Sequence, residues 1–374
     1  MTREHLTHFK VGNFKRFDSL ELTDIGQFNL IVGDNNVGKT SLLEALLFSE
    51  NPAMLFQTFH KLLIDRGIYI NPTFTYGSFG QIEQVFKPSE NFLAYIFNTF
   101  KKPLVFNSLS ENQKGPETIS LSFKDSLEMP REKFDQFSSD GFFAGMGFHF
   151  ESNKRYIESQ SNELIGRDIY RFFSPEVSQL ELPLLTVSRQ VDKTLADSYF
   201  KIIGTSRLAN KNLVQNLKHL VPKIETIEAR RIDNTDYMML GLEGVDEYQP
   251  INIFGEGTII FTNILLQIMK YRGKRLMIDE IDTGIHYSRM KKFLKTVFQV
   301  AQENDVQLFM TTHSLECQQA FAEVFEESDM MQYQGKVRQF TLLEKTDGQV
   351  KAVVRNFEQL EFALQTDNET RGGR

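Results

Sequence analysis

The sequence predicts an α/β protein with a mixed or parallel central sheet, and three stretches support this prediction. Each stretch is a short, largely apolar run that ends in glycine or polar residues. The three runs are residues 28–32, 275–278 and 306–310. Parallel strands are buried on both faces, so they appear as continuous apolar runs rather than alternating ones. The residues that follow them are expected at the carboxyl edge of the sheet, where α/β proteins bind ligands.

The first run leads into a glycine-rich loop. Residues 33–41 match the phosphate-binding pattern G-x-x-x-x-G-K-[ST] at every required position. The matched residues are Gly33, Asp34, Asn35, Asn36, Val37, Gly38, Lys39, Thr40 and Ser41. Glycines let the backbone curl so that its N–H groups surround an anion, and the helix predicted next adds the positive end of its dipole. Because a strand and a helix flank the loop, we predict an ATP site rather than a chance turn, with Lys39 on the β- and γ-phosphates and Thr40 on Mg²⁺.

Two carboxylates follow the second run. Asp279 and Glu280 stand where that strand ends, a position from which an acidic residue can hold the Mg²⁺ that bridges nucleotide phosphates. We assign this metal-holding role to Asp279. Glu280 is assigned as the catalytic base that positions or deprotonates the attacking water. An acidic turn after a strand is the structural alternative, which the phosphate-binding loop elsewhere in the chain disfavours.

A histidine follows the third run in the same way. His313 lies just past residues 306–310, after Thr311 and Thr312. A neutral imidazole at this place can hydrogen-bond a γ-phosphate or the attacking water. A single histidine after a strand is more often structural. Its position one helix and one strand after Asp279 favours a catalytic role instead.

Composition and charge exclude several classes of protein. The chain has 374 residues, enough to bury a large core. Its single cysteine, Cys317, excludes a disulfide framework and fits a reducing compartment, so we expect a cytoplasmic protein. The first residues do not resemble a signal peptide, and no apolar run is long enough to span a bilayer, so no membrane partner is expected. The net charge of -7 argues against a surface that coats nucleic acid, but it permits a local basic groove.

The remaining strands are predicted from alternating apolar residues. Alternation indicates strands near residues 9–11 and 20–22, and a hairpin over residues 337–354 around Asp347 and Gly348. Between about residues 56 and 183 the pattern is irregular. There we expect a strand-rich continuation of the first sheet that carries insertions.

Helical spacing predicts three further helices. They cover residues 195–221, 258–269 and 289–301. The first is expected to present one apolar face, formed by Leu208, Leu213, Leu217 and Leu220.

The order of these motifs resembles that of one family. A phosphate-binding loop, a long insertion, paired acids and a histidine follow one another as in ABC-class ATPases, specifically their soluble SMC-like and OLD-like branch. The local sequence around the motifs, at residues 13–17, 278–288 and 311–317, is also similar to that of the family. The chain looks like the bacterial OLD-like ATPases often found in anti-phage defence operons.

The resemblance implies the head of an ABC-type P-loop ATPase. Such a head has a mixed or parallel central sheet, an N-terminal antiparallel β-subdomain and a helical subdomain. We accordingly expect a discontinuous ATPase core at residues 1–55 and 188–330. A β-rich, family-specific insertion would occupy residues 56–187, and a C-terminal hairpin and tail residues 331–374.

The resemblance also implies a homodimer, or a higher homo-oligomer, with two ATP molecules between facing protomers. In such dimers the phosphate-binding loop of one protomer faces a signature motif of the other. The matching positions are Gly255, Glu256 and Gly257, which open an apolar helix and so offer a second anion site. Phe254 replaces the usual serine, leaving Thr258 as the alternative hydroxyl. An ordinary helix start is the competing interpretation.

Three more residues are carried over from the family. Asp282 matches the loop that couples the two composite sites. Lys15 and Arg16 match a basic position that reaches the nucleotide in SMC-like relatives. The family's glutamine has two candidates, Gln57 and Gln81, and the sequence does not choose between them.

Two departures from the family reduce the number of functions that this chain is expected to have. Full-length OLD nucleases carry a Toprim module after the ATPase, whereas about sixty residues follow His313 and none of them forms an Asp-x-Asp pair. No nuclease is therefore expected in this chain. Sustained heptads are also missing from the sequence, so the coiled coil of SMC-like repair ATPases is not expected.

Two functions from different classes remain. The first is an ATPase scaffold or sensor that controls a separately encoded effector, nuclease-like or a toxin, as in two-component defence systems such as PARIS. The second is a DNA-repair or recombination ATPase that binds DNA across the dimer. Its candidate phosphate contacts are Lys218, Lys223, Arg230, Arg231, Lys270, Arg272, Lys274 and Arg275. A transporter ATPase fits less well, because of the insertion and the altered signature.

Overall fold

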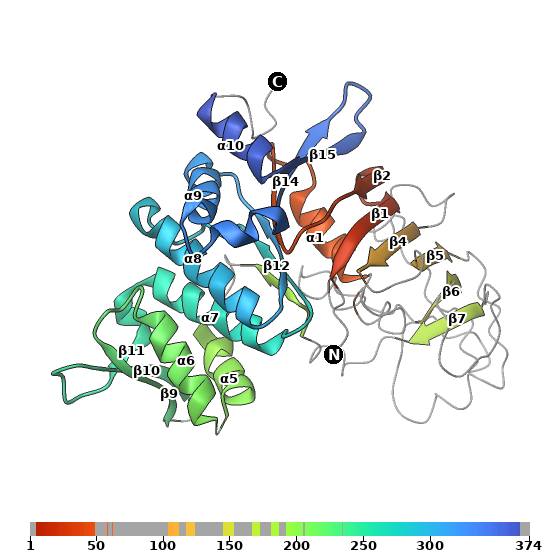
Figure 1. Cartoon of the computed structure of the whole chain (residues 1–374). Coiled ribbons are helices and arrows are strands. Elements are labelled where there is room, and N and C mark those ends of the chain that lie inside the picture. The colour runs from red at the N-terminus through yellow and green to blue at the C-terminus, as the bar shows by residue number, and fades with distance from the viewer. Residues whose placement is uncertain are drawn as a thin grey trace, which may run out of the picture.

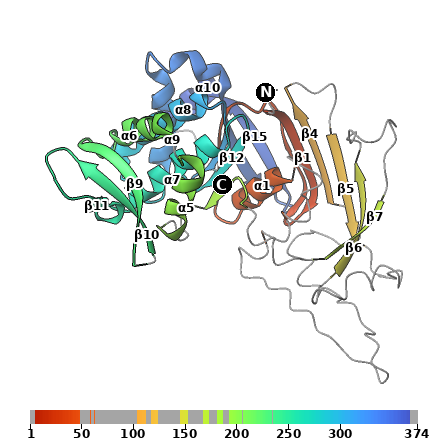
Figure 2. The same ribbon diagram turned by 90° about the horizontal axis from the view of Figure 1, so that it is seen from below.

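The computed structural model describes residues 5–48, 58, 62, 104–111, 117–123, 145–152, 167–172, 181–186, 192–204, 206–233 and 235–366. Within them, a central sheet lies between a group of helices on one face and an antiparallel sheet with helix α1 on the other (Figure 1, Figure 2).

The central sheet combines strands from distant parts of the chain. Its order is β15-β14-β3-β13-β12-β8, and every neighbouring pair is parallel except β14 with β15. The strands are β3 (Phe28–Gly33), β8 (Leu184–Thr186), β12 (Arg275–Asp279), β13 (Gln307–Thr311), β14 (Val337–Glu344) and β15 (Val350–Asn356). The predicted α/β class and the predicted C-terminal hairpin are both confirmed.

Helices cover both faces of this sheet. One face packs against helices α7 (Glu256–Lys270), α8 (Tyr287–Glu303) and α9 (Leu315–Glu326). The opposite face packs against α1 (Lys39–Leu47). Along the chain, the short helix η3 (Ile251–Phe254) precedes α7. The short helix η4 (Met331–Lys336) precedes β14, and helix α10 (Phe357–Gln365) follows β15. The helices predicted at residues 258–269 and 289–301 are thereby confirmed as α7 and α8.

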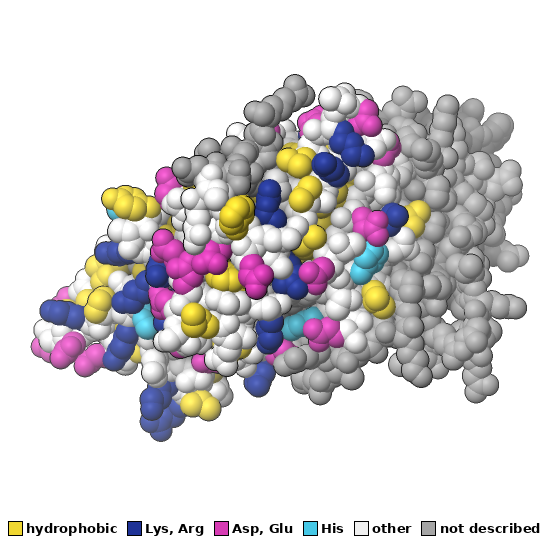
Figure 3. All heavy atoms as spheres, turned by 45° about the horizontal axis from the view of Figure 1, so that its top comes forward, with side chains coloured by type: hydrophobic (Ala, Val, Ile, Leu, Met, Phe, Trp, Pro, Cys, Tyr) yellow, Lys and Arg dark blue, Asp and Glu magenta, His cyan; other side chains and the backbone are white. Residues whose placement is uncertain are grey.

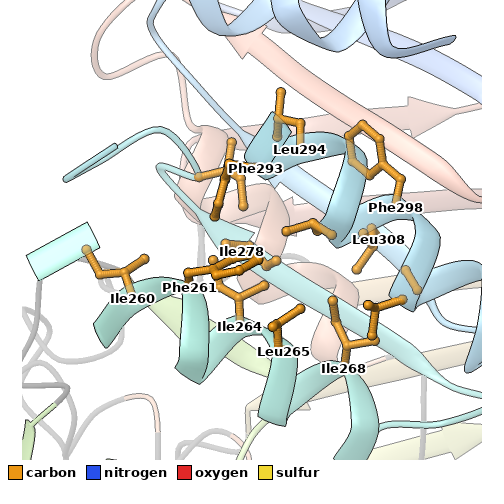
Figure 4. Packing of buried hydrophobic residues seen from close by; sticks show 14 of the residues in the cluster. Ile260, Phe261, Ile264, Leu265, Ile268, Ile278, Phe293, Leu294, Phe298 and Leu308 are labelled. Carbon is orange, nitrogen blue, oxygen red and sulfur yellow. The ribbon is translucent and has the colours of Figure 1, made fainter. Parts of the chain in front are cut away.

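Neighbouring residues of the central strands enter different hydrophobic cores. Ile278 and Leu308 point toward α7 and α8, where the apolar faces of the two helices meet above the sheet (Figure 4). Met277 and Phe309 enter the core on the α1 side. All four side chains are at most 1% exposed. Because both faces of these strands are covered, their sequences are largely apolar, as predicted.

A separate antiparallel sheet has the order β2-β1-β4-β5-β6-β7. Its strands are β1 (Leu6–Phe14), β2 (Phe17–Leu22), β4 (Leu104–Ser110), β5 (Glu117–Phe123), β6 (Gly145–Ser152) and β7 (Arg167–Phe172). The expected strand-rich continuation of the first sheet is therefore present in the described residues. The expected domain boundaries at residues 56, 188 and 331 stay predictions.

A third, smaller group combines strands and helices. Strands β9 (Ile224–Ile232), β10 (Thr235–Leu242) and β11 (Gln249–Pro250) form a sheet that contacts helices α5 (Asp192–Ile202) and α6 (Arg207–Leu217). Among the described residues, no helix is both long and apolar enough to cross a membrane.

The single helix predicted over residues 195–221 is wrong, because α5 and α6 are separate. The chain turns at Gly204, which has a φ of +50°, and Ser206 caps the new helix by accepting a hydrogen bond from the N–H of Ala209. This break changes the direction of the helix. Leu208 is consequently 69% exposed, whereas Leu213 is fully buried.

Candidate functional site

The phosphate-binding loop joins β3 to α1, as predicted. The two glycines that the phosphate-binding pattern requires have positive φ, +150° at Gly33 and +107° at Gly38. A Cβ at Gly38 would lie 2.8 Å from the ring of Phe17, and one at Gly33 would lie 2.7 Å from the carbonyl oxygen of Leu342. Both positions therefore require glycine, for backbone conformation and for space.

In the described part of the structure, Lys39 of the loop forms no ion pair with a carboxylate. The ammonium of Lys39 donates 2.8 Å hydrogen bonds to the carbonyl oxygens of Gly33 and Asp34. Burial lowers the pKa of Lys39 to about 8, and the negative charges of Asp279 and Asp34 only partly offset this effect. An anion beside the ammonium would raise the pKa again. The electrostatics of the loop therefore suit a phosphate.

Thr40, the residue after Lys39, contacts Asp279, the first of the two acids Asp279 and Glu280. Thr40 Oγ1 donates a hydrogen bond to Asp279 Oδ2 at 2.8 Å. Adjacent ligands of octahedral Mg²⁺, each roughly 2.0–2.1 Å from the ion, lie about 2.9 Å apart. The two oxygens thus have the spacing and the chemistry that one shared Mg²⁺ requires. Among the described residues, no group of three or more His, Cys, Asp or Glu is placed to hold a metal ion.

Glu280 turns the chain sharply at the end of β12. Its φ is +55°, a left-handed conformation that is uncommon for a residue other than glycine and is often found at functional sites. The backbone N–H of Glu280 donates to Thr311 Oγ1 at 2.8 Å, which holds the turn in place. The side chain is exposed. The carboxylate of Glu280 is therefore available at the open edge of the sheet.

His313 lies at the same edge and is also exposed. Partial burial, and after it the positive charge of Lys39, lower the pKa of His313 below its ordinary value. The imidazole is therefore neutral at neutral pH. The charges of Glu280, Asp282 and Asp279 act in the opposite direction. The structure thus brings the five predicted residues of the site close enough to interact electrostatically. They are His313, Lys39, Asp279, Glu280 and Asp282.

Two residues that shape this edge were missed from the sequence. Thr311 Oγ1 donates to Asp279 Oδ1, and Thr312 Oγ1 donates to Asp282 Oδ1, each at 2.6 Å. The only available signal was a pair of consecutive threonines between a strand and a histidine. Such a pair predicts the end of a strand but not its partners.

The two basic residues of the β1–β2 turn have different surroundings. Lys15 forms an ion pair with Glu44 of α1, whose side chain is only 2% exposed. Arg16 instead lies against the phosphate-binding loop, with its Cδ 3.1 Å from the place of a Cβ on Gly38. Its Nη2 pairs with Glu344 at 3.0 Å. Lys15 is thus paired with a residue of α1. Arg16 is the basic residue that lies beside the phosphate-binding loop.

Gly255, Glu256 and Gly257 open helix α7, as predicted. Gly255 has a φ of +88°, and among the described residues nothing lies within 4 Å of the place where its Cβ would be. Gly257 is crowded by comparison, since a Cβ there would lie 2.8 Å from the carbonyl oxygen of Gly284. The start of α7 therefore contacts the turn that follows the paired acids. Its outer side is open.

Thr258 does not supply an exposed hydroxyl in place of the signature serine. Its Oγ1 donates a 3.0 Å hydrogen bond to the carbonyl oxygen of Phe254, and the residue is 5% exposed. The hydroxyl is thus used within its own helix start. Only the backbone N–H groups remain as anion-binding groups there.

Half of the eight basic residues considered for DNA contact are paired or buried. Arg231 pairs with Asp236 through two 2.8 Å hydrogen bonds. The other engaged residues are Arg230, which pairs with Glu228, Lys270, which pairs with Glu181, and Arg275, which is 3% exposed. The face shown in Figure 3 carries basic and acidic side chains intermixed. DNA binding stays a prediction, which salt-dependent binding by the pure protein would check. Both glutamine candidates, Gln57 and Gln81, lie outside the described residues.

Over residues 28–316 the sequence matches the family described as "AAA domain, putative AbiEii toxin, Type IV TA system". That range includes the phosphate-binding loop, the paired acids and His313. The chain belongs to this family. This AAA-domain protein therefore contains a P-loop ATPase domain, and its loop, acids and histidine lie within it.

The AAA-domain protein also resembles a curated protein and several solved structures. A Helicobacter pylori protein named ATP/GTP phosphatase is 24% identical over 349 residues, covering 86% of this chain and 88% of the relative. The head of an SMC protein bound to the C-terminal winged-helix domain of ScpA superposes with a TM-score of 0.47 at 12% identity, covering 95% of this chain and 99% of that one. The SMC head domain of Thermotoga maritima gives 0.46 at 12% identity, covering 94% and 99%.

Proposed function

We propose that this AAA-domain protein binds ATP with Mg²⁺ and hydrolyses it to ADP and phosphate. The observation that supports this most is the hydrogen bond between Thr40 and Asp279, since it joins the loop to the paired acids at a spacing suited to one Mg²⁺. The name of the Helicobacter pylori relative, ATP/GTP phosphatase, agrees with hydrolysis. Phosphate release measured with ATP and with GTP tests the reaction and the choice of nucleotide. No release with either would contradict the proposal.

Each side chain has a separate task in this reaction. The loop N–H groups and the Lys39 ammonium hold the phosphates. Mg²⁺, held by Thr40 and Asp279, would supply positive charge to the β- and γ-phosphates. Water attacks the γ-phosphorus as the bond to the ADP oxygen breaks, and Glu280 accepts the proton of that water. Neutral His313 hydrogen-bonds the γ-phosphate.

The lowered pKa of Lys39 predicts that nucleotide affinity depends on pH. Without nucleotide, Lys39 loses its proton as the pH rises through about 8. A bound triphosphate favours the ammonium, so the pKa in the complex is higher. Affinity is therefore expected to be greatest below that pH and to fall above it by up to roughly tenfold per pH unit.

Calorimetry in two buffers with different ionisation enthalpies checks this expectation. Binding above the pKa of Lys39 should take up a proton from the buffer. The control is Lys39→Arg, because a guanidinium stays charged throughout this range. Equal proton uptake by this variant and the parent would show that another group titrates.

The proposal includes a second protomer that closes over the site. The open N-terminus of α7 at Gly255 is suited to a phosphate held by another copy of the chain. Two large apolar side chains are exposed near it, one two residues before Gly255 in the sequence and the other at the start of α8, three residues after Gly284. Ile253 is 61% exposed and Tyr287 is 70% exposed. Exposed apolar groups around an anion site favour an interface over a solvated surface.

Ile253→Asp is expected to prevent ATP from stabilising the dimer. A carboxylate in a closed interface would be desolvated and would repel the phosphates. Light scattering with and without ATP, in the Glu280→Gln background, measures the assembly. Phe362→Asp on α10 is the matched control, since Phe362 is 63% exposed and α10 lies apart from α7 in both views (Figure 1, Figure 2). A dimer that survives Ile253→Asp, or is lost equally in both variants, would place association on another surface.

The proposal further assigns the protein to a cytoplasmic, OLD-like or PARIS-like defence system with a separate effector. The family description includes a toxin and a toxin–antitoxin system, which supports a two-component arrangement. Copurification of the tagged protein with the products of its neighbouring genes is the test. A nuclease-like or toxin partner that associates according to the bound nucleotide is expected. Association that ignores nucleotide would contradict the sensor role.

A further inference from the structure

We infer that Thr311 and Thr312 are positioning residues that hold the acidic turn, an inference that rests on the proposed function. The register of the central sheet places the threonines beside the acids. Ile278 of β12 lies opposite Met310 of β13, so the next residue of each strand, Asp279 and Thr311, face each other at the sheet edge. The two threonines then contact different acids.

Thr311 fixes the carboxylate of Asp279. Its hydroxyl donates to Asp279 Oδ1 at 2.6 Å and accepts the N–H of Glu280 at 2.8 Å. A hydroxyl has one proton, so donation to the carboxylate and acceptance from the amide use it in a defined orientation. Asp279 Oδ2 is thereby left to face Thr40. Thr311 thus sets the direction of the proposed metal ligand and the left-handed turn at Glu280.

Thr312 performs the same task for Asp282. Its hydroxyl donates to Asp282 Oδ1 at 2.6 Å and accepts the N–H of Ser314 at 3.0 Å. These bonds attach the turn after the acids to the segment on both sides of His313. The segment that follows β13 and contains the histidine therefore holds the turn that carries Asp282.

Both contacts depend on the hydroxyl rather than on side-chain volume. Thr311 is 1% exposed and Thr312 is fully buried, so water cannot replace a missing donor without entering the core. Valine has the shape of threonine without the hydroxyl, and it would leave a carboxylate oxygen and an amide N–H unsatisfied. Serine keeps the hydroxyl and loses only a methyl group. The valine and serine variants therefore separate hydrogen bonding from packing.

The role of Thr311 is tested by titrating Mg²⁺ against binding of a fluorescent ATP analogue in the Glu280→Gln background, where hydrolysis does not interfere. Thr311→Val should raise the Mg²⁺ concentration for half-maximal binding by about tenfold, because the misdirected carboxylate loses a charged hydrogen bond. Thr311→Ser should restore the parental value. Thr296→Val is the control, since Thr296 is a 2% exposed threonine of α8 whose hydroxyl bonds only within its helix, to Lys292.

The role of Thr312 is expected to differ in kind. With Glu280 intact, Thr312→Val should lower the turnover number by about tenfold and leave the Mg²⁺ midpoint within about twofold, because it frees Asp282 and not Asp279. Thr312→Ser should restore turnover. An equal loss in the serine and valine variants would indicate packing and overturn the inference.

The outcomes distinguish the inference from the function on which it rests. If the parent binds no nucleotide, the proposed function and the inference both fail. If the parent binds nucleotide and Thr311→Val has the parental Mg²⁺ midpoint, the inference alone is overturned. Thr311→Ala, which also lacks the hydroxyl, replaces the valine variant if circular dichroism shows that Thr311→Val does not fold.

Discussion

Lys39→Ala is expected to weaken nucleotide binding by at least about a hundredfold, since each hydrogen bond from a charged donor contributes roughly 1.5–3 kcal/mol. The ammonium of Lys39 donates hydrogen bonds to two backbone carbonyls of the loop, those of Gly33 and Asp34. Nothing else in the loop sequence carries a positive charge. Within the loop, its removal leaves only backbone dipoles to oppose the phosphate charge.

Isothermal titration calorimetry with ATP and Mg²⁺ measures this loss. Lys39→Met, which keeps the length of the side chain, should behave like the alanine variant, because charge is the property that matters. Lys351→Ala removes an exposed lysine from β15 and should bind like the parent. Parental affinity in Lys39→Ala would show that the loop does not hold the nucleotide.

Glu280→Gln is expected to reduce the rate of hydrolysis by roughly 10²–10⁴-fold while leaving nucleotide binding unchanged. Glutamine keeps the size and the hydrogen bonding of glutamate but does not accept the proton. The N–H of residue 280 still bonds Thr311, so the turn is preserved. The variant should therefore accumulate in an ATP-bound, dimeric state, which light scattering and retained radiolabelled nucleotide would detect.

Two further variants serve as comparisons for Glu280→Gln. Glu303→Gln makes the same chemical change at an exposed glutamate at the end of α8 and should hydrolyse ATP at the parental rate. Asp279→Asn should instead weaken binding in a Mg²⁺-dependent manner, because it alters the residue that contacts Thr40. Parental turnover in Glu280→Gln would mean that the roles of the two acids are assigned wrongly.

The sequence by itself determined the α/β class and the three segments of the candidate site. A strand, a glycine loop and a helix that are contiguous in the chain form one unit whose conformation is set locally, since Gly33 and Gly38 take φ values that other residues avoid. The buried strands were equally clear, because a strand covered on both faces is largely apolar. The acids after β12 and the histidine after β13 then follow from where those strands end.

Only the tertiary structure decided which side chains meet. Thr40 and Asp279 are 239 positions apart in the sequence, and Thr311 and Asp279 are 32 apart. Their contacts exist because β13 lies between β3 and β12 in the sheet, a strand order that local residue preferences do not specify. The exposure of Leu208 was decided in the same way, by the direction in which α6 packs after the break at Gly204. Long-range packing, which depends on all the buried surfaces together, fixes contacts that local periodicity leaves open.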